Sequence, residues 1–175
     1  LGGRFAGSFV TLVVIFSGAG LGILAATSLP VFDQGLIGAF RPMSYLWPYL
    51  VSVVPNLFIM SAVFFGLTIL FRKLMPVYVA AVALFLGYLM ASNMVAVIEN
   101  RTIAALVDPL GMTAGIVTAF RFWTIAEKNT RLMPLEGLFL LNRAVWLSLA
   151  AAFLAASFGA FRFSQFALAF RPGRK

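Results

Sequence analysis

The stretch 45–98 reads YLWPYLVSVVPNLFIMSAVFFGLTILFRKLMPVYVAAVALFLGYLMASNMVAVI, and it decides the fold. It holds two apolar runs, 45–71 and 76–98, and its only charged residues, Arg72 and Lys73, lie between them. Each run is long enough to cross about 30 Å of hydrocarbon at about 1.5 Å rise per residue. Because only residues 72–75 link the two runs, the sequence predicts an antiparallel hairpin of two membrane spans with a basic turn.

Two further apolar runs, 5–28 and 138–161, extend the pattern to four spans. Two of the segments outside the runs hold all the acidic residues: Asp33, Glu99, Asp108, Glu127 and Glu136. The other three segments carry only cations: Arg4; Arg72 and Lys73; and Arg162, Arg171, Arg174 and Lys175. Because positively charged segments stay in the cytoplasm, we expect both ends of the chain there. The predicted fold is an all-α integral membrane protein, with residues 1–175 forming a single transmembrane domain.

Composition excludes several classes of protein. Hydrophobic residues make up 62% of the chain and charged residues 10%, which a soluble domain of this length could not bury. Without cysteine or histidine the chain has no disulfide, no thiolate and no imidazole base or metal ligand. We therefore expect no enzyme activity and no cofactor in this chain. The net charge of +8 is explained by cations next to anionic lipid headgroups, so membrane lipids rather than nucleic acid are the expected partners.

The segment between the third and fourth runs is predicted to hold an external helix, at about 102–127. Asp108 and Pro109 have the form of a helix N-cap followed by a first-turn proline, and the helix would run to about Ala126. Gly111 and Gly115 weaken its intrinsic helicity, so lipid or protein must support it. A helix lying at the outer membrane surface before the last span fits best.

Small residues at four-residue spacing predict where membrane helices pack closely. Such rows occur in the first, third and fourth runs: Gly3, Gly7, Gly18 and Gly22; Ala83, Gly87 and Ala91; and Ala144, Ser148, Ala152, Ala156 and Ala160. Glycine is also simply common in membrane helices, which is the alternative for each pair in the first run. The five-residue row of the fourth run implies a neighbouring helix along its whole length.

Pro55 and Asn56 interrupt the second run. A proline removes a backbone donor and kinks a helix, and Asn56 could bind the carbonyl that is released. The two residues indicate either a broken helix that lines a translocation path or an ordinary kink with an interhelical hydrogen bond.

Four charged residues flank or enter the fourth run: Glu127, Arg131, Glu136 and Arg143. Arg143 is costly inside a span unless it snorkels or pairs, and Glu136 and Glu127 are its candidate partners. The group is interpreted either as an external gate or docking surface, or as a salt-bridged cap that seals the outer mouth of the bundle.

Several short motifs lie in the same region: DPLG at 108–111, FWT at 122–124, EKNTRL at 127–132, PLEG at 134–137 and LNRAVW at 141–146. In these motifs the chain resembles bacterial ABC-transporter permeases of the type-2 exporter class, in particular the permease part of proteins fused to a zinc aminopeptidase. The resemblance is strongest over 108–146. The rest of the chain agrees in span number, in the sign of its loops and in its glycine-rich first span.

The resemblance implies an ATP-driven exporter in the bacterial cytoplasmic membrane, with this multi-pass chain similar to the last four spans of a six-span permease half. Since the sequence also begins with Leu1 at the edge of a span, we expect a piece of a larger permease. A peptidase motif H-E-x-x-H is impossible here, and no phosphate-binding loop occurs.

ATP would therefore act through a separate ATP-binding subunit, and a second permease half or further copies of the chain would complete the path. Arg4, Arg72 and Lys73 are the candidate ATPase contacts, although topogenic charge explains them equally well. The alternative function is a membrane-embedded structural subunit that assembles a larger complex through small-residue helix faces.

Overall fold

The computed structural model describes residues 1–27, 29 and 40–169, with side chains as far as residue 161. The elements in this part of the chain are all helical. Four helices are long and apolar enough to cross a membrane: α1 (Gly2–Thr27), the continuous helix Met43–Phe71, α4 (Met75–Met94), and α8 (Gly137–Ala169), which qualifies over Gly137–Phe161. The prediction of an all-helical chain with four helices long and apolar enough to span a membrane is confirmed for the described residues. Residues 30–39, with Asp33, and the cations Arg171, Arg174 and Lys175 lie outside the described residues, as does the side chain of Arg162.

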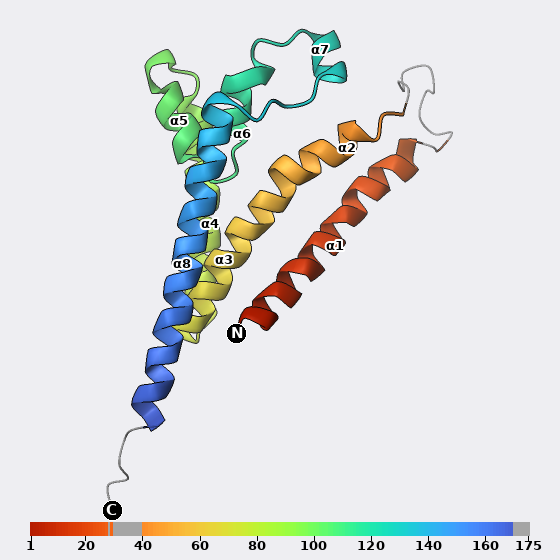
Figure 1. Cartoon of the computed structure of the whole chain (residues 1–175). Helices are drawn as coiled ribbons and strands as arrows, with labels where there is room; N and C mark the ends of the chain where they lie inside the picture. The colour runs from red at the N-terminus through yellow and green to blue at the C-terminus, as the bar shows by residue number, and fades with distance from the viewer. Residues whose placement is uncertain (28, 30–39, 170–175) are drawn as a thin grey trace, which may run out of the picture.

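The spans form an open bundle with a cap at one end (Figure 1). We use "cap" for residues 98–130, which hold η3 (Ile98–Asn100), α5 (Arg101–Val107), α6 (Met112–Gly115), η4 (Ile116–Phe120) and α7 (Ile125–Thr130). The start of α1 and the link between α3 and α4 lie at the opposite end (Figure 1). The bundle therefore carries its short helices on one side only.

The tight turn between the second and third spans is confirmed. The helix α3 (Val54–Phe71) ends where Arg72 adopts a left-handed conformation, with φ of 52°, and its N–H donates to the carbonyl of Thr68 at 2.9 Å. The helix α4 then begins with Pro76 in its first turn, where the missing N–H costs nothing. This helix ends at Met94, four residues before the end of its apolar run.

The second span is one continuous helix in three parts: α2 (Met43–Pro48), the π-helical turn η2 (Tyr49–Val53), and α3. Pro55 has no N–H for the carbonyl of Val51, four residues earlier, and its ring crowds that turn. The wider π-turn just before Pro55 relieves the crowding. The result is a curved helix rather than a broken one (Figure 1).

The most extensive contact between spans joins α3 and α8. Ile59 and Ala62 of α3 pack against Ala150 and Leu154 of α8, and all four are buried. At Gly66 a Cβ atom would lie 2.6 Å from Cε1 of Phe153 and 2.8 Å from Oγ of Ser157. Only glycine admits so close an approach, so this position, which the rows of small residues did not include, sets the packing of the two helices.

The predicted small-residue rows mostly face away from the rest of the chain. A Cβ atom at Gly3, Gly7, Gly18 or Gly22 would meet nothing within 4 Å. Exposed positions include Ala83 on α4 and the whole row of α8: Ala144, Ser148, Ala152, Ala156 and Ala160. Only the end of the α4 row makes contacts, because Gly87 lies against Pro109 and Ala91 is fully buried. The expected close contacts at the other positions are therefore absent within the described chain.

The helix α1 contacts the bundle through aromatic rings rather than through its glycines. Phe5 lies edge-on to Phe58 and Phe65 of α3, with ring centroids 6.0 and 5.5 Å apart. Phe9 meets the same Phe58 at 5.8 Å. A hydrogen bond from Tyr49 to the carbonyl of Val13 adds to these ring contacts, and none of the residues of α1 is buried.

The prediction of one external helix opening at Asp108 is wrong. Residue 108 ends α5 in an extended conformation, since a residue before proline disfavours the helical region. Its carboxylate accepts from the N–H of Leu110 at 2.8 Å, which stabilises the turn after α5. It also accepts from the N–H of Thr113 at 2.6 Å, in the first turn of α6. A second break follows η4, where Thr124 becomes the N-cap of α7. The cap is thus a set of short helices joined by turns.

Candidate functional site

A buried polar cluster joins the cap to two spans. It centres on Asn142 and Arg143 in the second turn of α8, which are 0% and 3% exposed, and on Asp108 of the cap, which is 0% exposed. Polar side chains so deeply buried must be hydrogen-bonded, because each unpaired one costs several kcal/mol in an apolar environment. The bonds they make define what the cluster does.

Asn142 and Trp146 bind the end of α5. The amide nitrogen Nδ2 of Asn142 donates to the carbonyls of Ala105 at 2.6 Å and of Asp108 at 2.8 Å. The indole N–H of Trp146 donates to the carbonyl of Leu106 at 3.0 Å. The last carbonyls of a helix have no partner within the helix, so these two side chains of α8 satisfy the C-terminal end of α5.

Arg143 joins the same cluster to α3. Its Nε and Nη2 donate to Oδ1 of Asn142 at 3.0 and 2.6 Å, and its Nη1 donates to Oδ1 of Asn56 at 2.6 Å. Its Nη2 also lies 3.4 Å from the carbonyl of Pro109, and the guanidinium is 5.9 Å from the ring centre of Phe139. The guanidinium thus binds amides, a carbonyl and an aromatic ring.

This arrangement corrects the expected pairing of Arg143 with Glu136 or Glu127. Among the described residues, the ion pair found is the one between Arg131 Nη2, just after the exposed helix α7, and Glu127 Oε1 within it, at 3.0 Å. Glu136 lies exposed before α8. The four charged residues grouped by sequence therefore separate into a buried arginine, a surface pair and a solvent-facing carboxylate.

Glu127 has a local structural role. Its carboxylate accepts from the N–H and the hydroxyl of Thr124, and the Thr124 hydroxyl accepts from the Glu127 N–H, which completes a capping box at the start of α7. The backbone hydrogen bond from Thr124, and after it the hydroxyl bond, hold the pKa of Glu127 below its usual value. The charge of Arg131 acts in the same direction.

Asn56 is the link between the polar cluster and the space beside it. Its Nδ2 donates to the carbonyl of Leu110 at 3.0 Å, while its Oδ1 holds Arg143. Asn56 thus makes an interhelical hydrogen bond, as expected for the kink, and the carbonyl that it binds belongs to the cap. Pro55 is half-buried in the helix and does not line the cavity next to Asn56.

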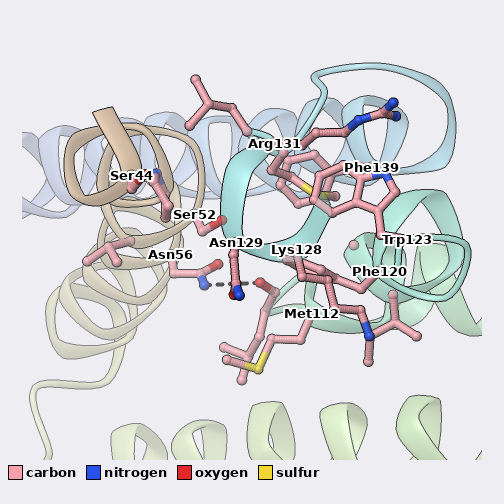
Figure 2. Close-up of a pocket in the computed structure, with 18 residues that line it drawn as sticks. Ser44, Ser52, Asn56, Met112, Phe120, Trp123, Lys128, Asn129, Arg131 and Phe139 are labelled. Atoms are coloured by element: carbon pink, nitrogen blue, oxygen red, sulfur yellow. Dashed lines mark hydrogen bonds between the residues drawn. The ribbon is translucent and has the colours of Figure 1, made fainter. Parts of the chain in front are cut away.

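A cavity of about 540 Å³ lies between the curved second span and the cap. Figure 2 shows it with Ser44, Ser52 and Asn56 on the side of the span and with Phe120, Trp123 and Lys128 on the side of the cap. Both π-helical turns contribute to its wall, Ser52 and Val53 from η2 and Ile116 and Phe120 from η4. Such turns are frequent at functional sites.

Glycine at position 111 separates the cavity from the cluster. Gly111 lines the cavity and has a left-handed φ of 71°. A Cβ atom there would lie 2.0 Å from Nη2 of Arg143. The guanidinium of Arg143 therefore lies directly behind the cavity wall, and any side chain at position 111 would have to displace it.

Two of the short motifs, 108–111 and 141–146, meet in this cluster, although they are far apart in the chain. The sequence indicated Asn56 and Arg143 as separate candidates, but it did not indicate their contact or the roles of Asn142 and Gly111. A polar Asn-Arg pair within an apolar run was the available signal, because such residues inside a membrane require partners.

The candidate ATPase contacts lie away from this cluster. Arg4, Arg72 and Lys73 are exposed at the far end of the bundle.

The comparisons with known proteins add no family to this picture. No protein-family model, no curated protein and no solved structure matches the chain. Within the described residues, no three His, Cys, Asp or Glu side chains come together as ligands for a metal. The geometry of the cluster and the cavity is therefore the basis for the functional argument.

Proposed function

We propose that the chain is the membrane-spanning part of an ATP-driven exporter of the bacterial cytoplasmic membrane, working with a separate ATP-binding subunit. The observation that carries the proposal is the convergence of motifs 108–111 and 141–146, both part of the resemblance to type-2 exporter permeases, in one buried cluster. The contact between the two motifs supports the proposal because it makes them parts of one site.

The geometry supports movement of the cap together with α3 and α8. Asn56, Asn142 and Trp146 fasten the cap to both spans, so the cap moves as one piece with them. None of the residues of α1 is buried, and it contacts the second span through the rings of Phe5 and Phe9 and the hydrogen bond from Tyr49, so its separation would cost less than that of the cap. In the proposed mechanism, the ATPase acts on the basic end of the bundle and rocks the spans, which opens the path next to Asn56.

A membrane-embedded structural subunit is the second candidate. The exposed small-residue row of α8 favours it, because such a row lets another helix approach closely. The two functions differ in whether an ATPase is present and whether transport depends on it.

The first test is purification in mild detergent followed by mass spectrometry of every chain in the complex. A Walker-type ATPase in stoichiometric amount is the expected result, and its ATP hydrolysis should fall when Arg72 and Lys73 are both changed to Gln. A complex that holds no ATPase would reject the exporter and leave the structural subunit.

A further inference from the structure

The cavity beside Asn56 has the size and the lining of a ligand site. Its volume of about 540 Å³ falls within the range of small-molecule pockets, roughly 300–1,000 Å³. Most of its wall is apolar and includes Pro48, Val53, Leu110, Ile116 and Phe120. A fully polar ligand would lose its hydration there without replacement, so the occupant must be partly apolar.

The charges at the cavity have one sign. Lys128 and Arg131 line it, and none of the described residues that line it is acidic. Glu127 holds Arg131 at 3.0 Å, whereas Lys128 has no ion-pair partner in the part of the chain that the structure describes. Ser44, Ser52 and Asn129 add hydroxyl and amide groups to the wall. A ligand with an anionic group fits this end of the cavity.

The apolar wall continues onto the surface of the cap. Met112, Ile116 and Phe120 line the cavity and are also 57%, 42% and 42% exposed. Phe122 and Ile125, which follow along the chain, are 73% and 80% exposed. Large apolar side chains in this number belong against acyl chains rather than water, so the cavity opens toward the membrane.

We propose that this cavity binds an anionic phospholipid from the surrounding membrane, with its phosphate next to Lys128 and its acyl chains along Ile116 and Phe120. The cavity joins an apolar wall, an unpaired cation and a membrane-facing opening, and this lipid matches all three. The inference concerns binding alone and does not depend on the transport function.

The test is photo-crosslinking in bilayers of phosphatidylcholine that contain a trace of phosphatidylglycerol with a photoreactive acyl chain. The complex is reconstituted as purified, and labelled peptides are mapped by mass spectrometry. Labelling should fall on residues 110–123, and unlabelled phosphatidylglycerol should compete with it while extra phosphatidylcholine should not. Competition by water-soluble glycerol phosphate would identify a free anion as the ligand and overturn the lipid assignment.

Two matched pairs of variants locate the site. Lys128→Gln should lower the labelling about fivefold, the effect of one cation near an anionic headgroup, while Lys73→Gln at the far end of the bundle should leave it unchanged. Ser52→Phe should fill the cavity and remove the labelling, while Val79→Phe on the exposed face of α4 should not. Equal labelling in Lys128→Gln and the native chain would contradict the proposal, whatever the ATPase test shows.

Discussion

At the scale of single residues, Arg143 explains how a membrane span tolerates a buried charge. Its five N–H donors point in fixed directions, and four hydrogen bonds from Nε, Nη1 and Nη2 reach the side chains of Asn56 and Asn142 and the carbonyl of Pro109. The positive charge is thus spread over polar groups that hold the cap in place. Removing the donors would leave buried oxygens without partners.

The variant Arg143→Gln tests this role. Glutamine has two N–H donors on a shorter side chain, so at least one amide oxygen loses its partner, and we expect a loss of about 2 kcal/mol or more in the free energy of unfolding. Arg131→Gln is the control, since it removes only an exposed ion pair, which contributes little to stability. The midpoint of thermal unfolding in detergent measures both, and equal midpoints would show that the cluster contributes little.

Gly111→Ala tests the contact between the cavity wall and Arg143. The left-handed backbone costs alanine roughly 1–2 kcal/mol, and the new methyl group must displace a guanidinium nitrogen that lies 2.0 Å away. We expect lower thermal stability and weaker protection of the cap from proteolysis. Gly159→Ala, where a Cβ atom meets nothing within 4 Å, should cause neither change. A stable Gly111→Ala variant would mean that the guanidinium can move aside.

At the scale of secondary structure elements, the contact between α3 and α8 depends on Gly66. Gly66→Ala places a methyl group 2.6 Å from Phe153, and overpacking of this kind costs about 1–3 kcal/mol. We expect a lower unfolding midpoint for Gly66→Ala and an unchanged midpoint for Gly22→Ala on α1, where the space is open. The opposite order would show that the glycines of α1 hold the fold.

The capping box of α7 makes the stability of the cap depend on pH. Because the pKa of Glu127 is lower in the folded chain than in the unfolded one, its stabilisation is complete above the ordinary glutamate pKa of about 4.3. It is lost as the pH falls through the lower pKa of the folded state. The amide resonance of Thr124, which donates to Glu127, should shift in this acidic window. In Glu127→Gln the capping box persists without a titrating group. A shift of the Thr124 resonance in that variant would therefore assign the titration to another group.

The elements differ in how well the sequence predicts them. The four spans follow from uninterrupted apolar runs, and the turn at Arg72 follows from its two charges. The cap was predicted less well, since the Asp-Pro pair was interpreted as the start of a helix, whereas Asp108 ends one helix and supports the next through its carboxylate. Local signals of this kind do not distinguish an N-cap from a turn, because both use the same side-chain hydrogen bonds.

At the scale of the whole molecule, the rows of small residues identified helix faces suited to close packing but did not indicate which helix packs against each face. The face of α8 that packs against α3 holds Ala150, Leu154 and Ser157, which are one or two positions away from the row that spacing suggested. A helix presents several faces with small residues, and only the tertiary contacts show which one lies inside the chain. The polar cluster could not be predicted either, since it depends on residues up to 87 positions apart.

Ala150 and Ala152 offer a comparison between the inner and the outer face of α8. Ala150 is 3% exposed against α3, whereas Ala152 is exposed. Ala150→Leu should overpack the core and lower the unfolding midpoint by the equivalent of about 1–3 kcal/mol. Ala152→Leu adds the same atoms to the outer face, so the chain itself should keep its stability.

The outer variant then reports on assembly. If another helix approaches the row from Ala144 to Ala160, the leucine at position 152 separates the two backbones and removes most of their van der Waals contact. We expect Ala152→Leu to elute from size-exclusion chromatography in mild detergent as a smaller complex, with an unchanged unfolding midpoint. A complex of native size would show that the row does not contact a partner helix, which would leave the open faces of α1, without a buried residue, and of α4, where Ala91 is the buried one, for helix contacts with partners.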